Sequence, residues 1–185
     1  MHSDIEQILI PQSRIAARVA ELAMQIVIDH TPPRLPTGEL TIIPVMTGAM
    51  IFTSDLIRRM PIAMKIGLML VSSYPGTSVK SQGVQMLAER VGEIRGHHVI
   101  VIDDILDSGQ TLTAVTAQLR QMGAAAVRSC VLLRKDRPEA RAFPVDYVGF
   151  DIPDAFVVGY GLDYNDYYRN LPDIVTLNSS LLKAE

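Results

Sequence analysis

This 185-residue chain contains one cysteine and no tryptophan, and its basic side chains do not outnumber its acidic ones. A single cysteine, Cys130, excludes a disulfide framework and a cysteine-based zinc site. It lies in the run 127–133, which predicts a buried and unreactive thiol. The 17 lysines and arginines are outnumbered by 20 aspartates and glutamates, which argues against binding to nucleic acid. A small molecule or a protein is therefore the expected partner.

Long hydrophobic segments are also missing. The longest, 40–52, is interrupted by Pro44 and Gly48 and is shorter than the roughly 20 residues that cross a bilayer. The opening residues MHSDIEQ are acidic and precede no long apolar core, which argues against a secretory signal. No GxxxxGK[ST] motif occurs, which excludes a Walker-type loop. We therefore expect a cytoplasmic protein that does not bind membranes.

The apolar residues alternate between two patterns along the chain. Helical spacing predicts helices over 11–30 and 112–122, with a third helix-like segment ending at Met60. Strands that alternate with helices predict an α/β fold, a mainly parallel twisted sheet flanked by helices. Short apolar runs predict the strands, at 40–46, 62–71, 99–102, 126–133, 147–152, 156–160 and 174–177.

Two polar stretches fall outside these elements. Residues 72–83 (SSYPGTSVKSQG) contain little that a core could use, which predicts a mobile loop. We hypothesise that it closes over the substrate as a lid. His97 and His98 have no partner at metal-ligand spacing, so we interpret them as surface residues.

The most informative stretch is 99–112 (VIVIDDILDSGQTL), where an apolar strand leads into paired aspartates and then a short loop that opens a helix. Ligands of open parallel sheets bind at the carboxyl ends of the strands. Backbone N–H groups of such a loop, with the positive end of the helix behind them, suit a phosphate monoester. The predicted phosphate-binding residues are Asp107, Ser108, Gly109, Gln110 and Thr111.

Acids beside a phosphate site need another role, because like charges repel. Asp103 and Asp104 could accept hydrogen bonds from two vicinal hydroxyls, as on a ribose, directly or through bound Mg²⁺. Asp107 would then be free for proton transfer. The alternative is a helix cap at Asp107 or Ser108 beside a solvated turn. The whole combination at a strand end favours a functional site.

This stretch resembles the signature of the type I phosphoribosyltransferases: two acids, a hydrophobic pair, Asp, Ser or Thr, Gly and a later Thr. Two downstream segments, 132–138 (LLRKDRP) and 147–172, are similar to the hypoxanthine-guanine branch of that family. The similarity covers most of the chain after Leu40. It implies Mg²⁺-dependent transfer of a phosphoribosyl group from its pyrophosphate donor, phosphoribosyl pyrophosphate, to a 6-oxopurine.

The resemblance implies a purine site. Lys135 would donate to the 6-oxo oxygen, an acceptor that adenine lacks. Phe156 would stack on the base, while backbone groups near Val157 and Asp163 would read its far edge. Taken alone, Lys135 would fit a solvated charged turn and Phe156 a packed core.

The resemblance also implies a donor site. Arg169 would hold pyrophosphate oxygens through its fork of donors, and Asp107 would accept the N7 proton of the purine as general base. The family's pyrophosphate loop corresponds to Thr47 and Gly48. The carboxylates implied to bind Mg²⁺ are Asp103, Asp104 and Asp163.

Two positions depart from the family's pattern. Relatives commonly carry Lys or Arg where this chain has Thr47, so backbone amides would have to bind pyrophosphate without a side-chain charge. Many relatives carry Glu where this chain has Asp103, and the shorter side chain reaches less far toward the ribose. Ser73 and Tyr74 resemble a Ser-Tyr pair of the family's lid.

The expected organisation is one phosphoribosyltransferase domain over residues 1–185. Its core would span roughly 38–150, with a small hood built from the N-terminal segment and roughly 151–185. The resemblance further implies a homo-oligomer, either a dimer or a tetramer.

Two alternatives remain beside the expected salvage of hypoxanthine and guanine. One is a homologue that prefers xanthine, because the purine 2-position is read largely by backbone. The other is a regulator that keeps the fold and binds nucleic acid, against which the net charge of −3 weighs.

Overall fold

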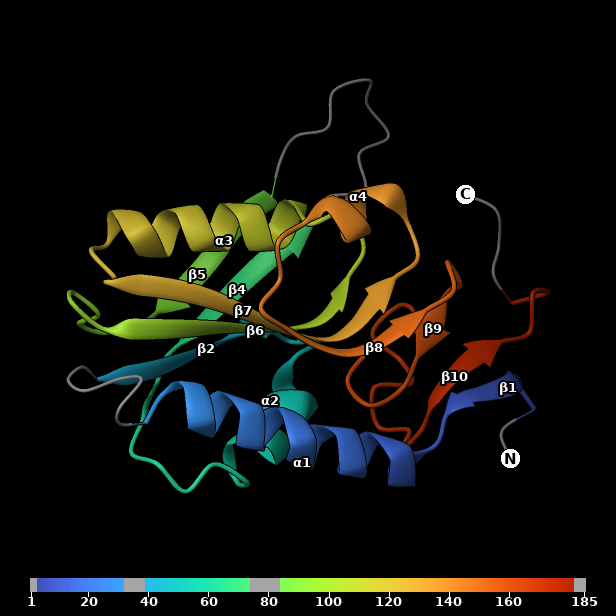
Figure 1. The fold of residues 1–185 in the computed structure, drawn as a ribbon. Coiled ribbons are helices and arrows are strands. Elements are labelled where there is room, and N and C mark those ends of the chain that lie inside the picture. Colours follow the sequence, from blue (N-terminus) through green and yellow to red (C-terminus); the bar gives the residue numbers. More distant parts are fainter. Residues whose placement is uncertain (1–2, 32–38, 74–83, 182–185) are drawn as a thin grey trace.

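The computed structural model describes residues 3–31, 39–73 and 84–181, which form two sheets and four helices (Figure 1). The larger sheet has seven strands in the order β5-β4-β2-β6-β7-β8, with β3 beside β2. All of its pairings are parallel except β4 with β5, which confirms the predicted α/β class. Its strands are β2 (Leu40–Met46), β3 (Lys65–Ile66), β4 (Leu68–Ser73), β5 (Val84–Arg90), β6 (His98–Leu106), β7 (Ala126–Lys135) and β8 (Tyr147–Ile152).

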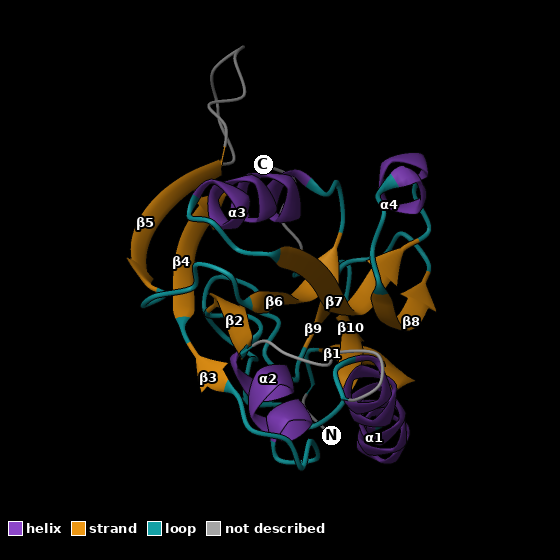
Figure 2. Cartoon of the chain, turned by 60° about the vertical axis from the view of Figure 1, so that its left-hand side comes forward, coloured by secondary structure: helices purple, strands orange, loops and turns teal. Residues whose placement is uncertain are grey.

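Helices cover both faces of this sheet. Figure 2 shows α3 on one side of it and α1 and α2 on the other, while the short α4 follows β7. None of the helices in the described residues is long and apolar enough to cross a membrane. The helices are α1 (Gln12–Asp29), α2 (Met50–Ile57), α3 (Gln110–Gln121) and α4 (Pro138–Ala142).

Strand β6 explains why the central strands are apolar on consecutive residues. Its side chains alternate between the two faces, so Ile100 and Ile102 join the core cluster under α1 and α2. Val99 and Val101 join the cluster under α3. Because both faces are covered by helices, the consecutive positions Val99 to Asp103 are all buried, as in parallel sheets generally. After His98, polar residues therefore appear only where β6 nears its carboxyl end.

The smaller sheet joins both ends of the described chain. Its strands pair antiparallel in the order β1-β10-β9, and the sheet lies beyond the carboxyl-end side of the large one (Figure 1). Asn178 Nδ2 also donates to Ser3 O at 2.8 Å. The strands are β1 (Ile5–Ile10), β9 (Val157–Val158) and β10 (Ile174–Leu177).

Several sequence-based predictions need correction. The single strand predicted over 62–71 is wrong, because the chain forms β3 and β4 on either side of Gly67. A Cβ at Gly67 would lie 2.6 Å from Ile43 Cδ1 and 3.0 Å from Arg90 O, so the chain crosses closely here. The predicted mobile loop began too early, since β4 runs to Ser73, and residues 74–83 lie outside the described ones. Neither β1 nor β5 was predicted.

Two further predictions were inaccurate. The strand predicted over 156–160 is reduced to β9, because Gly159 (φ 96°) and Tyr160 (φ 51°) turn the chain out of the sheet. His97 is not a surface residue: it is 8% exposed, and its Nδ1 lies 2.9 Å from Thr41 Oγ1. A buried imidazole needs such a partner, and only the fold brings Thr41 next to it.

Candidate active site

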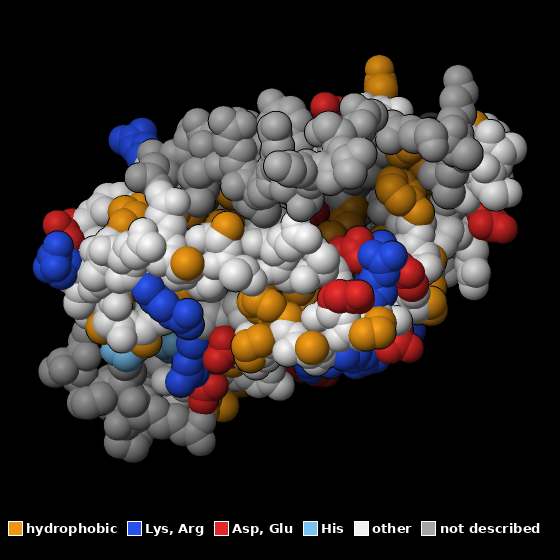
Figure 3. All heavy atoms as spheres, turned by 90° about the horizontal axis from the view of Figure 1, so that it is seen from above, with side chains coloured by type: hydrophobic (Ala, Val, Ile, Leu, Met, Phe, Trp, Pro, Cys, Tyr) orange, Lys and Arg blue, Asp and Glu red, His pale blue; other side chains and the backbone are white. Residues whose placement is uncertain are grey.

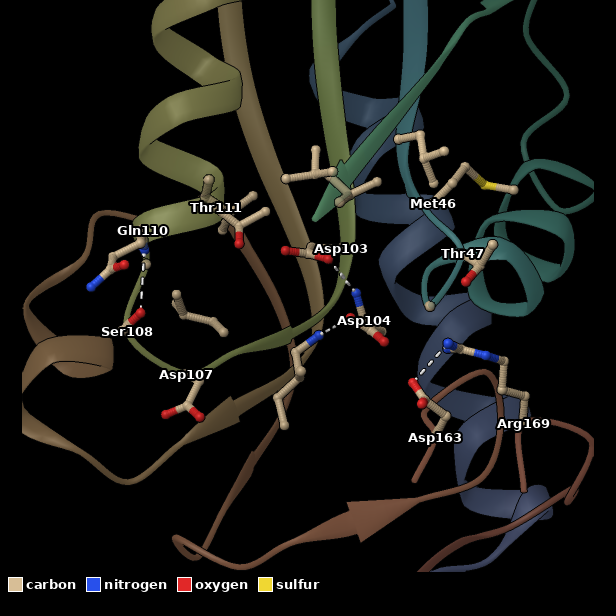
Figure 4. A pocket seen from close by; sticks show the side chains of 18 of the residues that line it. Met46, Thr47, Asp103, Asp104, Asp107, Ser108, Gln110, Thr111, Asp163 and Arg169 are labelled. Carbon is tan, nitrogen blue, oxygen red and sulfur yellow. Dashed lines mark hydrogen bonds and ion pairs between the residues drawn. The ribbon is translucent and has the colours of Figure 1, made fainter. Parts of the chain in front are cut away.

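A cavity of about 600 Å³ opens where β2 and β6 reach their carboxyl ends. Three segments surround it: the loop between β2 and α2, the turn between β6 and α3, and the loop between β9 and β10 (Figure 4). A smaller cavity of about 180 Å³ adjoins it and shares Asp104, Asp107 and Asp163 with it. This edge is where parallel sheets generally bind ligands.

The turn between β6 and α3 has the geometry of a phosphate cradle. Gly109 precedes the first residue of α3 with φ 78°, a left-handed conformation that glycine adopts without strain. A Cβ there would also lie 2.7 Å from Phe143 Cδ2. Ser108 and Thr111 line the cavity beside the start of the helix. Backbone N–H groups of a helix's first turn have no partner within the helix and can donate to an anion.

The paired acids Asp103 and Asp104 lie at the base of the cavity. Asp103 is 7% exposed, and its Oδ1 accepts a hydrogen bond from Asp104 N at 3.1 Å. Burial raises the pKa of Asp103 well above its usual value, and the neighbouring charge of Asp104 raises it further. Burial raises the pKa of Asp104 as well. A cation or hydrogen-bond donors from a ligand would offset this cost of burying like charges.

The loop after β2 packs directly on Asp104. A Cβ at Gly48 would lie 1.9 Å from Asp104 Oδ2, so only glycine fits there. The preceding peptide bond, Met46–Thr47, is cis. Gly161, at φ 108°, comes so close from the other side that its Cβ would lie 2.2 Å from Gly48 O. Thr47 is exposed at the cavity's edge and offers a hydroxyl without charge.

Arg169 approaches the cavity from the opposite side. Its Nη1 donates to Gly161 O at 2.9 Å, and its Nη2 lies 2.8 Å from Asp163 Oδ1. Asp166 accepts from the same Nη2 at 2.9 Å. The guanidinium therefore sits between two acids at the rim of the cavity, where its position suits an incoming anion.

The smaller cavity combines one cation with an aromatic ring. Lys135, the last residue of β7, and Phe156, just before β9, both line it. Phe156 is 43% exposed and meets Tyr164 edge-on at 5.5 Å between ring centroids. An exposed face on a large aromatic ring is available for stacking, which excludes the packed-core alternative for Phe156.

Asp107 lines both cavities and pairs with two cations. Its carboxylate accepts hydrogen bonds from Lys135 Nζ at 3.1 Å and from Arg137 Nη1 at 2.5 Å. Partial burial raises the pKa of Asp107, but the hydrogen bonds from Arg137 and Lys135 together outweigh it, so the net pKa is lowered. Asp107 is therefore ionised at neutral pH and can accept a proton.

A metal would have to be bound jointly with a ligand. Among the described residues, no three His, Cys, Asp or Glu side chains converge as a ready cage. Asp103 and Asp104 are nevertheless adjacent and carry no cation of their own, while Asp163 is paired with Arg169. Mg²⁺ commonly uses only one or two protein carboxylates together with substrate phosphates, so this donor set fits it.

Comparison with known proteins places this geometry in a family. The sequence profile of the phosphoribosyl transferase domain matches residues 5–165. The chain belongs to this family.

Relatives in the family are similar over nearly their full length. A hypoxanthine-guanine phosphoribosyltransferase of Mycobacterium avium is 43% identical over 179 residues, covering 95% of this chain and 87% of the relative. The Bacillus subtilis protein of that name is 35% identical, covering 100% of this chain and 99% of the relative.

Solved structures agree. A Staphylococcus aureus hypoxanthine phosphoribosyltransferase has TM-score 0.89 and 35% identity, covering 100% of this chain and 97% of that one. The Trypanosoma cruzi enzyme in complex with the product IMP has TM-score 0.87 and 36% identity, with 98% of both chains covered.

The fold brings all the side chains predicted for the site to these two cavities. Their individual roles remain predictions, because position alone does not test chemistry. The larger cavity is lined by Thr47, Gly48, Asp103, Asp104, Asp107, Ser108, Gly109, Gln110, Thr111, Asp163 and Arg169. The smaller cavity is lined by Lys135, Phe156 and Val157, again with Asp104, Asp107 and Asp163.

Three charged residues at the site escaped the sequence analysis. Arg137 binds Asp107, Asp154 binds both Lys135 and Arg137, and Asp166 binds Arg169. Arg137 lies two residues after Lys135, so the charged run there carried a signal. Asp154 gave none, because its partners are distant in the sequence. Asp166 lies only three residues before Arg169, but both are in a loop without a regular spacing that would indicate the contact.

Proposed function

We propose that the chain transfers the 5-phosphoribosyl group of phosphoribosyl pyrophosphate to N9 of hypoxanthine or guanine. The products would be IMP or GMP and pyrophosphate, so the protein would be a purine salvage enzyme. The observation that carries this proposal is the pair of adjoining cavities that share Asp107. One has a phosphate cradle, and the other has a lysine beside an exposed aromatic ring.

The donor would occupy the larger cavity. Its 5-phosphate would accept hydrogen bonds from the turn at 107–111, and its ribose hydroxyls would face Asp103 and Asp104. The pyrophosphate would lie between the backbone of Thr47 and Gly48 and the guanidinium of Arg169. Departure of pyrophosphate leaves positive character on the ribose, so donors fixed around the leaving group lower the barrier.

Mg²⁺ is the cofactor that this arrangement suits, brought in with the pyrophosphate and bound by Asp103, Asp104 and Asp163. When bound, it would supply Lewis-acid neutralisation of charge on the leaving group. Asp163 is held near the cavity by Arg169 at 2.8 Å, and Asp103 and Asp104 are held by their own backbone contacts.

The base would occupy the smaller cavity. Lys135 would donate to the 6-oxo oxygen, and it would meet an amino group if adenine entered. Phe156 would cover one face of the ring, with backbone groups near Val157 and Asp163 at the far edge. As N9 bonds to the ribose, the N7 proton becomes acidic and can pass to the ionised Asp107.

Two finer points belong to the same proposal. The chain would work in the cytoplasm as a homo-oligomer, either a dimer or a tetramer. Light scattering on the purified protein would determine the number of subunits.

The large sheet, roughly residues 38–150, would form the catalytic core. The N-terminal segment and roughly 151–185 would form a hood that carries Phe156, Val157 and Asp163.

The decisive experiment measures Mg²⁺-dependent turnover of phosphoribosyl pyrophosphate with hypoxanthine, guanine, xanthine and adenine. The native chain should convert the first two, and Asp107→Asn should lower kcat by roughly 10²–10⁴-fold. Asp136→Asn is a matched control, because Asp136 is an acid that lines neither cavity. Faster conversion of xanthine would shift the assignment to a xanthine-preferring enzyme. Turnover of none of the bases would contradict the proposal and favour the regulator.

A further inference from the structure

Four charged side chains close a ring where the two cavities meet. Asp107 faces Lys135 Nζ at 3.1 Å and Arg137 Nη1 at 2.5 Å. Asp154 faces the same two cations, at 3.4 Å from Lys135 Nζ and 2.9 Å from Arg137 Nε. Each of the four carboxylate oxygens is therefore matched to one nitrogen, and the charges of the ring balance.

The ring joins segments that are distant in the sequence. Asp107 lies in the turn before α3, Lys135 ends β7, and Arg137 immediately precedes α4. Asp154 lies between β8 and β9 and so belongs to the segment that leads to the purine-facing residues. In the space-filling view, acidic and basic side chains lie side by side next to a hollow (Figure 3).

The four members are not equivalent. Lys135 and Asp107 both line the smaller cavity and have roles in the proposed reaction, whereas Arg137 lines only the larger cavity and Asp154 lines neither. The side chain of Lys135 is only 13% exposed, against 42% for Arg137 and 44% for Asp154. An ammonium has three hydrogens, so a lysine held by two carboxylates keeps one for the purine.

We propose that Arg137 and Asp154 are positioning residues that hold Asp107 toward the purine N7 and Lys135 toward the 6-oxo oxygen. This inference rests on the proposed function, because the roles of Asp107 and Lys135 come from it. Arg137 suits the task because its planar fork donates in two fixed directions, through Nη1 to Asp107 and through Nε to Asp154. In this role, neither Arg137 nor Asp154 needs to contact the base.

Removal of Arg137 and removal of Asp154 should shift the pKa of Asp107 in opposite directions. Without Arg137, Asp107 keeps Lys135 as its only contacting cation and the ring becomes negative. Without Asp154, both cations interact with Asp107 alone and the ring becomes positive. Among the described residues, Lys135 and Arg137 are the charged groups that lower the pKa of Asp107. Asp104 and Asp163 line the same cavity and are unchanged in every variant considered.

Arg141 offers a matched control. It follows Arg137 by one helical turn, its side chain is 41% exposed, and it also pairs with two acids, Asp136 and Asp151, each at 3.0 Å. Neither acid lines the two cavities. Arg141→Gln therefore removes the same kind of interaction from the same segment without touching the ring.

The first measurement is a carboxyl-carbon NMR titration of Asp107 in the protein without ligands. Arg137→Gln should raise the pKa of Asp107 by about one unit, because a contacting cation is lost. Asp154→Asn should lower it, because the two cations no longer share their charge with a second acid. Arg141→Gln should leave it unchanged. General loosening of the structure would move both ring variants the same way, so opposite shifts identify the ring.

The second measurement is the pH profile of kcat/KM for hypoxanthine. Activity falls in acid as Asp107 becomes protonated, so Arg137→Gln should move this acidic limb to higher pH by about one unit. Asp154→Asn should move it to lower pH, while its loss of a hold on Lys135 should raise KM for the base. Arg137→Lys should restore the limb in part, because it returns the charge without the fork.

The outcomes separate this inference from the proposed function. Opposite shifts in the titration support the ring whether or not the native chain turns over a purine. A native chain that converts hypoxanthine, together with Arg137→Gln that behaves like Arg141→Gln in both measurements, would overturn the inference and leave the function intact. Shifts of equal sign in Arg137→Gln and Asp154→Asn would overturn it as well.

Discussion

Two acidic regions of the same stretch of chain have the same residue type but opposite pKa shifts. Asp103 and Asp104, inside the end of β6, are adjacent and contact no cation of the described residues, and burial raises the pKa of both. Asp107, in the turn that follows, contacts two cations, and its pKa is lowered. Surroundings rather than residue type thus set the charge state: burial disfavours the ionised pair unless a cation or hydrogen-bond donors bind it, whereas Asp107 stays ionised at neutral pH.

The largest effect should come from forcing Asp104 out of place. Gly48→Ala would put a Cβ 1.9 Å from Asp104 Oδ2, so the carboxylate or the loop has to move. A displacement of about 1 Å at a site can cost on the order of 100-fold, and we expect kcat/KM for phosphoribosyl pyrophosphate to fall by about that factor.

Gly149→Ala controls for a clash that lies elsewhere. Its Cβ would lie 2.4 Å from Leu132 O within the large sheet, away from both cavities. We expect lower stability but unchanged kcat/KM per folded molecule. Equal losses of kcat/KM in the two variants would show that the contact between Gly48 and Asp104 has no special importance.

A smaller effect, on stability, should come from removing one charge of the pair. Because the pKa of Asp103 is raised in the fold, its ionised form destabilises the folded state as pH rises above the unfolded pKa. Asp103→Asn should therefore raise the free energy of unfolding at neutral pH by about 1–2 kcal/mol, and the gain should vanish in acid. Denaturant unfolding at several pH values, without Mg²⁺ or nucleotide, measures this; a loss of stability at neutral pH would contradict it.

The smallest effect should have the opposite sign. The lowered pKa of Asp107 means that its ionised form stabilises the fold above the unfolded pKa, and this contribution is lost as pH falls through the folded pKa. Asp107→Asn should lower the free energy of unfolding at neutral pH by only about 0.5 kcal/mol, because solvent screens a side chain that is 42% exposed. The same denaturant series checks it. If Asp107→Asn and Asp103→Asn change stability in the same direction, the contrast between the two regions is wrong.

Elements with a clear local pattern of apolar residues were predictable from the sequence, whereas strands that depend on distant pairing partners were not. Strand β6 and helix α3 were predictable, since one contains a continuous apolar run and the other has buried residues at helical spacing. The strands β1 and β5 were not, because their pairing with β10 and β4 depends on partners elsewhere in the chain. The predicted strand over 62–71 is divided at Gly67 because β3 and β4 pair with different parts of β2, which no local pattern reveals.

By itself, the sequence determined the α/β class and the family and predicted a phosphate site at 107–111, because each depends on residues that are neighbours along the chain. Only the tertiary structure decided which charges face one another. The ring of Asp107, Lys135, Asp154 and Arg137 unites the ends of β6 and β7 with the loop after β8. The opposite pKa shifts of Asp103 and Asp107 likewise arise from burial and from cations brought by other segments. Electrostatic interactions depend on distance in space, and distance in space is what folding determines.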